Sequence, residues 1–102
     1  MKTIVIVNPQ AGNGRTEEIW PNIESALKKS IGSFEVLQTT CQGDAEGLSR
    51  RILAVDTVRI VAVGGDGHLN EVLNGFIEND LPVNPEARLS FVMTGTGCDF
   101  QR

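Results

Sequence analysis

The sequence contains few of the thiol and imidazole side chains that commonly bind zinc. Its 102 residues include two cysteines, Cys41 and Cys98, and a single histidine, His68. The separation of the two cysteines matches no zinc-binding spacing, and two isolated thiols in an intracellular protein are expected to be reduced. These observations argue against a Cys/His metal site and against a cysteine nucleophile.

Positive charge and long apolar runs are also scarce. Nine Lys and Arg residues stand against thirteen Asp and Glu residues, which gives a formal net charge of -4. Nucleic-acid binding and docking on an anionic membrane both need clustered positive charge. No apolar run approaches the roughly 20 residues of a transmembrane helix. Met1 leads directly into a strand pattern, so we predict no signal peptide, no nucleic-acid partner and a cytoplasmic protein.

Short runs rich in β-branched residues predict four strands. The runs are continuous rather than alternating, which is typical of strands buried on both faces in a parallel sheet. They are Thr3–Val7, Phe34–Gln38, Val58–Val63 and Leu89–Met93.

Helical patterns separate these runs. Thr16 is a candidate N-cap for the first helix, and Pro21 predicts that this helix begins late or kinks near Trp20. A second helix is predicted over Asp44–Ala54, and a third begins near Gly67 or His68. The positions expected to face the core are Ile19, Ile23, Ala26, Leu27, Ile31, Leu48, Ile52, Leu53, Leu69, Val72, Leu73, Phe76 and Ile77.

This alternation of strands and helices predicts a single α/β domain. We expect a three-layer α/β/α, doubly wound parallel sheet of Rossmann-like type, with strand order 2-1-3-4 and right-handed crossovers. The segment Glu78–Arg88 contains two prolines and is predicted to be a loop.

Glycine-rich turns follow three of the predicted strands, at Asn8–Gly14, Gly64–Gly67 and Thr94–Gly97. The carboxyl ends of parallel strands share one edge of the sheet, so these turns should converge on one crevice. Glycine backbone and helix N-termini suit a phosphate group, although glycine also serves tight turns for steric reasons alone. The polar groups expected to assist belong to Asn8, Asn70, Thr94 and Thr96.

Two common phosphate-binding motifs are absent. Neither "GNGRTEE" nor "GGDGHLN" carries the Lys-Ser/Thr pair of a P-loop, and "GNGRTE" lacks the third glycine of a dinucleotide fingerprint. Asp66 within a phosphate loop would repel the anion unless a cation intervenes or the carboxylate holds another ligand group. Its alternative role is to cap the third helix.

The motifs "NPQAG", "GGDGHLNEVLNG" and "TGTGCDFQR", in this order and spacing, resemble those of the diacylglycerol kinase catalytic domain family. That family includes bacterial diacylglycerol kinases, YegS-type lipid kinases and sphingosine and ceramide kinases. The resemblance implies transfer of the γ-phosphoryl group of ATP, with Mg²⁺, to the hydroxyl of diacylglycerol or a related lipid. GGDG also occurs in NAD kinases and 6-phosphofructokinases, so a kinase acting on a soluble substrate and an inactive nucleotide-binding module are the alternatives.

The resemblance also implies site residues. It makes Asp66 and Asp99 candidates for the active-site network, and it identifies no catalytic base and no metal ligand in this chain. The implied ATP contacts are Asn8, Pro9, Gln10, Ala11, Gly12, Thr39, Gly65, Asp66, Gly67, His68, Leu69, Asn70, Glu71 and Thr96.

Two positions depart from the family pattern. His68 replaces the usual Thr, and Cys98 replaces the usual Asn before the Asp-Phe pair. His68 would bring positive charge near phosphate at low pH, and its alternative role is a solvent-facing residue in the first helical turn. Cys98 is the weaker hydrogen-bonding group of the two residue types.

Family members resemble two-domain enzymes in which a C-terminal β-rich domain supplies the general base and most Mg²⁺ ligands. Residues 1–102 are therefore expected to form the N-terminal nucleotide-binding domain, inactive on its own. Apolar surface that met the second domain should promote self-association of this domain. Peripheral contact with a membrane is expected of the full enzyme only.

Overall fold

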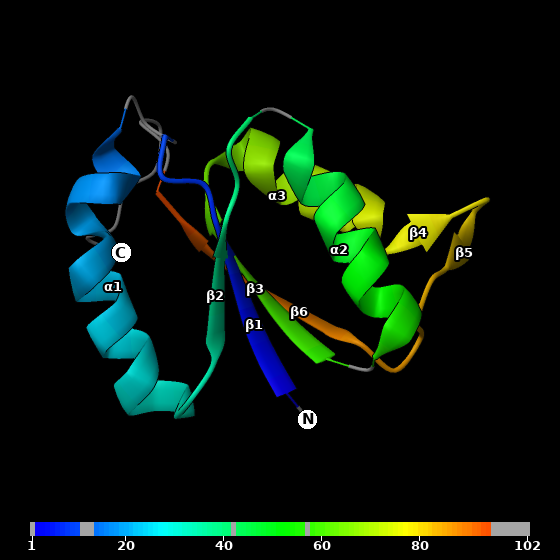
Figure 1. The fold of residues 1–102 in the computed structure, drawn as a ribbon, viewed down its shortest axis with the longest axis horizontal. Helices are drawn as coiled ribbons and strands as arrows, with labels where there is room; N and C mark the ends of the chain where they lie inside the picture. Colours follow the sequence, from blue (N-terminus) through cyan, green and yellow to red (C-terminus); the bar gives the residue numbers. More distant parts are fainter. Residues whose placement is uncertain (1, 11–13, 42, 57, 95–102) are drawn as a thin grey trace.

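Strands and helices alternate along the chain, as the sequence predicts (Figure 1). The structure is a computed structural model that describes residues 2–10, 14–41, 43–56 and 58–94. The elements are β1 (Lys2–Val7), α1 (Arg15–Ile31), β2 (Glu35–Gln38), α2 (Asp44–Val55), β3 (Val58–Gly64), α3 (Asp66–Gly75), β4 (Ile77–Glu78), β5 (Leu81–Pro82) and β6 (Arg88–Met93).

The main sheet is parallel and has the order β2-β1-β3-β6, which confirms the predicted order 2-1-3-4. Ile4 of β1 lies opposite Glu35 of β2 and Ile60 of β3. In turn, Ile60 lies opposite Leu89 of β6. Because all strands run the same way, their carboxyl ends meet at one edge, where the glycine-rich turns begin.

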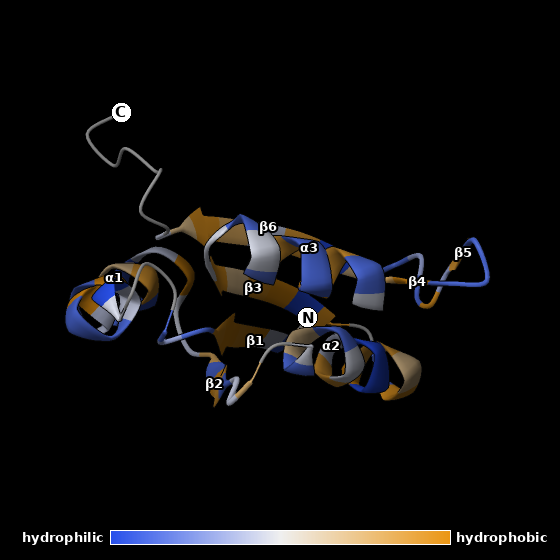
Figure 2. Cartoon of the chain, turned by 90° about the horizontal axis from the view of Figure 1, so that it is seen from above, coloured by the Kyte–Doolittle hydropathy of each residue, from blue (hydrophilic) through white to orange (hydrophobic). Residues whose placement is uncertain are grey.

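The helices cover both faces of this sheet, and the three-layer prediction is confirmed (Figures 1 and 2). Val5 and Val7 of β1 face α1, whereas Ile4 and Ile6 face α2 and α3. Strands β1 and β3 are buried on both faces, as their unbroken apolar runs predict. Strands β2 and β6 are more exposed because each is at an edge of the sheet.

Helix α1 begins earlier than predicted and has a different cap. Gly14 precedes it with a left-handed φ of 88° that favours glycine, and no side chain caps the helix. The predictions of a Thr16 cap and of a late start are therefore wrong. Pro21 lies inside the helix and has no N–H to donate to the carbonyl of Glu17. Both residues are exposed, so water can reach this carbonyl. None of the helices in the described ranges is long and apolar enough to cross a membrane.

The segment after α3 differs from the predicted pattern. Leu73 is 42% exposed and Ile77 is 52% exposed, so neither faces the core as predicted. Ile77 has already left the helix and belongs to β4, which pairs with β5 in an antiparallel ribbon. Asn79 and Asp80 between them have φ of 54° and 64°, values typical of a two-residue hairpin turn. This ribbon replaces the first part of the predicted loop at Glu78–Arg88.

Candidate functional site

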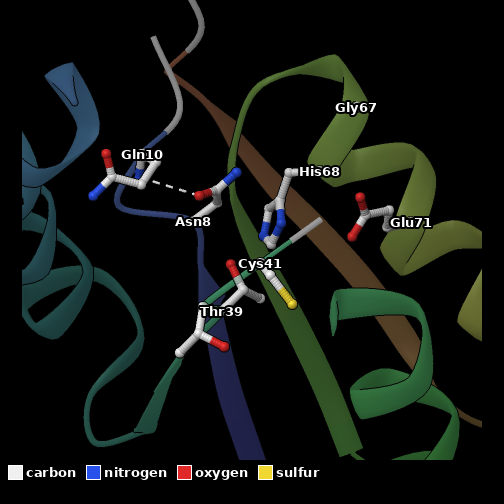
Figure 3. A pocket seen from close by; sticks show the side chains of 8 residues that line it. Asn8, Gln10, Thr39, Cys41, Gly67, His68 and Glu71 are labelled. Carbon is white, nitrogen blue, oxygen red and sulfur yellow. Dashed lines mark hydrogen bonds between the residues drawn. The ribbon is translucent and has the colours of Figure 1, made fainter. Parts of the chain in front are cut away.

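A cavity of about 330 Å³ opens at the carboxyl edge of the sheet (Figure 3). It joins the ends of β1 and β2 to the first turns of α3, three segments that are far apart in the sequence. The residues that line it are Asn8, Gln10, Thr39, Thr40, Cys41, Gly67, His68 and Glu71. Six of these eight are among the ATP contacts implied by the resemblance; Thr40 and Cys41 are additions.

The loop after β1 is fixed by hydrogen bonds to its neighbours. The backbone N–H of Asn8 donates to the carbonyl of Val63 in β3 at 2.9 Å. The Asn8 side-chain oxygen accepts from the N–H of Gln10 at 3.1 Å. The carbonyl of Pro9 accepts from the N–H of Glu17 in α1, also at 3.1 Å. This wall of the cavity is thus tied to both the sheet and a helix.

The loop after β2 forms the opposite wall. Asp44 accepts hydrogen bonds from the hydroxyl of Thr40 at 2.7 Å and from the N–H groups of Thr40 at 2.9 Å and Cys41 at 3.2 Å. The Thr40 hydroxyl and these N–H groups lower the pKa of Asp44 well below its usual range. In return, the Asp44 carboxylate raises the pKa of the Cys41 thiol, which does not favour a nucleophilic role.

Of this wall, only Thr39 was predicted from the sequence, although the sequence contains a pattern that indicates Thr40 and Cys41 as well. The polar run "TTCQGD" follows β2, and the end of that parallel strand must lie at the same edge of the sheet as the other turns.

Helix α3 directs its N-terminus at the rim of the cavity. Gly65 precedes it in an extended conformation, and no side chain caps the helix, so the alternative role of Asp66 as a cap is wrong. Asp66 is instead its first residue and is exposed. The N–H of Leu69 donates to the carbonyl of Gly65 at 3.0 Å. The N–H groups before it have no partner within the helix, and such groups with the helix dipole favour an anion.

His68 extends from α3 toward the sheet, between Asn8 and Cys41 (Figure 3). It is 5% exposed, so its alternative role as a solvent-facing residue is wrong. Its Nε2 lies 2.9 Å from the carbonyl oxygen of Ile6. A carbonyl can only accept, so Nε2 carries the proton. Burial lowers the pKa of His68, although the Ile6 bond and the charge of Glu71 oppose this shift.

Glu71 is the charged residue of the cavity wall. One of its carboxylate oxygens accepts from the backbone N–H of Ala45 at 3.3 Å, which joins α3 to the start of α2. Lys and Arg are absent from the described residues that line the cavity. An anionic ligand would therefore be held here by backbone N–H groups and a helix dipole rather than by basic side chains.

Comparison with known proteins places this arrangement in a family. The sequence profile described as "Diacylglycerol kinase catalytic domain" matches residues 2–102. The chain belongs to this family. It is 37% identical over 83 residues to Sphingoid long-chain bases kinase 1 of Arabidopsis thaliana, covering 79% of this chain and 11% of that protein. It is 33% identical over 98 residues to the Diacylglycerol kinase of Staphylococcus carnosus, covering 96% of this chain and 31% of that protein.

Solved structures of diacylglycerol kinases share the fold of this chain. A crystal structure of a diacylglycerol kinase from Bacillus anthracis matches with a TM-score of 0.74 at 29% sequence identity. The match covers 97% of this chain and 35% of that one. The chain thus spans about a third of the length of the bacterial relatives it matches.

Not every predicted site residue lies at the cavity. Thr94 is fully buried; its hydroxyl pairs with that of Thr16, and its N–H donates to Gly64 at 2.7 Å. Its predicted role beside phosphate is therefore wrong. Leu69 packs against the core and Asn70 is exposed, and neither side chain lines the cavity. The predicted site residues that lie outside the described residues are Ala11, Gly12, Thr96, Cys98 and Asp99.

The described side chains do not provide a ligand set for Mg²⁺. Within the four described ranges, no group of three or more His, Cys, Asp or Glu side chains is arranged so that it could hold a metal ion. These residues do not form a magnesium cage by themselves.

Proposed function

We propose that this chain is the nucleotide-binding part of an ATP-dependent lipid kinase. It would bind ATP for transfer of the γ-phosphoryl group to the hydroxyl of diacylglycerol or a related lipid, and it would correspond to the N-terminal domain of such an enzyme. The observation that carries the proposal is the cavity at the carboxyl edge, where the ends of β1 and β2 meet the N-terminal turns of α3 in a member of this family. The names of its relatives support a lipid acceptor.

The triphosphate fits best at the start of α3. There the free N–H groups of the first turn and the positive end of the helix dipole would hold it. Gly67 leaves this approach open, because a Cβ atom built on it meets nothing within 4 Å. The loops after β1 and β2 would flank the remainder of the nucleotide.

In the reaction, the lipid hydroxyl oxygen forms a bond to the γ-phosphorus. The bond from that phosphorus to the oxygen bridging the β- and γ-phosphates breaks, and ADP leaves. The hydroxyl proton passes to a base, which we do not assign among the described residues. Such a transfer depends mainly on positioning and charge stabilisation.

The first test is a titration of the 102-residue chain with ATP, followed by NMR, with and without Mg²⁺. We expect amide shifts concentrated at Asn8–Gln10, Thr39–Cys41 and Gly67–Glu71. Gly67→Asp adds a carboxylate where phosphate should bind, and an acidic residue at a helix N-terminus is otherwise favourable. It should weaken ATP binding at least about tenfold by charge repulsion. Gly47→Asp in α2, where a Cβ also meets nothing within 4 Å, is the matched control.

Absence of shifts at several millimolar ATP would refute nucleotide binding, and equal losses in the two Asp variants would refute its location. The acceptor is tested on a full-length kinase that contains this chain, with radiolabelled ATP and three substrates: diacylglycerol in mixed micelles, a sphingoid base and NAD. Transfer to a lipid supports the proposal. Transfer to NAD alone would replace it with a kinase acting on a soluble substrate.

A further inference from the structure

The orientation of the His68 ring is fixed by two contacts with the sheet. A Cβ atom built on Gly64 would lie 2.8 Å from Cδ2 and 2.9 Å from Cγ of His68, so this edge of the ring rests on β3. Nε2 next to it donates to the carbonyl of Ile6 in β1 at 2.9 Å. Cδ2 and Nε2 form one edge of an imidazole, and Nδ1 lies on the other. The Nδ1 edge is therefore turned away from both strands, and His68 is one of the residues that line the cavity.

The proton on Nε2 decides what Nδ1 can bind. In a neutral imidazole with hydrogen on Nε2, Nδ1 carries a lone pair and can only accept a hydrogen bond. The adjacent Glu71 presents a carboxylate, which also only accepts. This part of the wall therefore offers acceptors, whereas the start of α3 offers N–H donors. Phosphate oxygens are acceptors and are mismatched with the His68 side of the cavity.

We propose that His68 determines nucleotide specificity by accepting, at Nδ1, a hydrogen bond from a donor group of the nucleoside. The donor is a ribose hydroxyl or the adenine amino group. The cavity would then orient the nucleotide with its nucleoside toward His68 and Glu71 and its triphosphate toward the N-terminus of α3. This inference rests on the proposed function, since it assumes that the cavity binds ATP.

The test compares five ligands by calorimetry at pH 8, where His68 is neutral. They are ATP, 2′-deoxy-ATP, 3′-deoxy-ATP, ITP and inorganic tripolyphosphate. His68→Gln keeps a terminal amide that can donate to Ile6 but has no acceptor at the δ position. His68→Asn places a carbonyl oxygen near the position of Nδ1. Thermal unfolding and the NMR spectrum of each variant report whether it is folded.

We expect the wild-type chain to bind ATP about 3- to 10-fold more tightly than the analogue that lacks the relevant donor, as befits one hydrogen bond. His68→Gln should lose this preference and bind ATP weaker by the same factor, whereas its affinity for tripolyphosphate stays unchanged. His68→Asn should retain the preference. The analogue that reveals the difference identifies the donor as the 2′-hydroxyl, the 3′-hydroxyl or the amino group.

Equal weakening of ATP and tripolyphosphate by His68→Gln would overturn the inference, because it would make His68 a phosphate contact. Equal losses in the Gln and Asn variants would also overturn it, since a purely structural role would affect both. Wild-type binding of ATP with no discrimination among the analogues overturns this inference alone. Failure of the wild-type chain to bind any of the nucleotides overturns the proposed function as well.

Discussion

Substitution of Gly64 by alanine should destabilise the protein through one side chain. Gly64 ends β3, and a Cβ atom there would lie 2.8 Å from Cδ2, 2.9 Å from Cγ and 2.9 Å from Cβ of His68. Ordinary carbon contacts begin near 3.5 Å, so the ring would have to move. The buried ring is also held by its bond to Ile6. Overpacking of this kind costs about 1–3 kcal/mol, which is the loss we expect for Gly64→Ala.

A double-mutant cycle isolates this clash. His68→Ala removes Cδ2 and Cγ, which are two of the three close atoms, and leaves Cβ. Gly64→Ala should therefore cost clearly less in the His68→Ala background, with a coupling free energy of about 1–2 kcal/mol. The free energies of unfolding come from urea denaturation at pH 8, where His68 is neutral in both the native and the unfolded chain.

The matched control is Gly47→Ala in α2, where a Cβ meets nothing within 4 Å. This substitution should stabilise the chain by about 0.5–1 kcal/mol, because alanine favours helix more than glycine does. If Gly64→Ala costs the same in the wild-type and His68→Ala backgrounds, the close contact does not determine the position of the ring, and the reasoning fails.

Two further predictions concern pH. Asp44→Asn should lower the melting temperature at pH 7, because the Asp44 carboxylate accepts hydrogen bonds from the N–H groups of Thr40 and Cys41. The pKa of Asp44 is lowered in the native state, so the difference in melting temperature between wild type and variant should shrink as the pH falls below about 4. For His68 the native pKa is lowered from 6.5, so the unfolded chain takes up a proton first. The free energy of unfolding should fall as the pH drops below about 6.5, and His68→Gln should remove this part of the dependence in urea titrations between pH 5 and 8.

The strands and their order could be predicted because the information is local. The runs Thr3–Val7 and Val58–Val63 are continuous and β-branched, which requires burial on both faces. Such strands separated by helices leave few topologies, and the order 2-1-3-4 follows from these rules. The meeting of the turns after β1 and β3 at one cavity followed in the same way, because parallel strands end at one edge.

The errors arise where tertiary contacts override local preferences. Thr16 precedes an apolar helical pattern and has the type of an N-cap, but its hydroxyl pairs with that of Thr94, 78 residues away. Thr16 therefore does not act as the predicted N-cap, and Thr94 does not act as the predicted phosphate contact. His68 follows a glycine motif and has the position of a surface residue. Its ring is buried because Gly64 of β3 leaves space for it and because the carbonyl of Ile6 in β1 accepts its hydrogen bond.

The glycines of "GGDGHLNEVLNG" serve different purposes, and one of them yields a sharper prediction. A Cβ atom on Gly75 would lie 1.8 Å from Oγ of Ser49 and 2.6 Å from the backbone oxygen of Glu46 in α2. Gly75 is thus the point where α3 approaches the backbone of α2. A carbonyl of a helix cannot rotate away as a side chain can, so Gly75→Ala should cost more than Gly64→Ala, at least about 3 kcal/mol.

Ser49→Gly should not rescue Gly75→Ala, because it removes the hydroxyl and leaves the Glu46 oxygen in place. This outcome contrasts with the partial rescue expected at Gly64, where the obstacle is a side chain alone. The free energy of unfolding of the double variant decides the point. Full rescue by Ser49→Gly would show that the hydroxyl, rather than the backbone, sets the distance between α2 and α3.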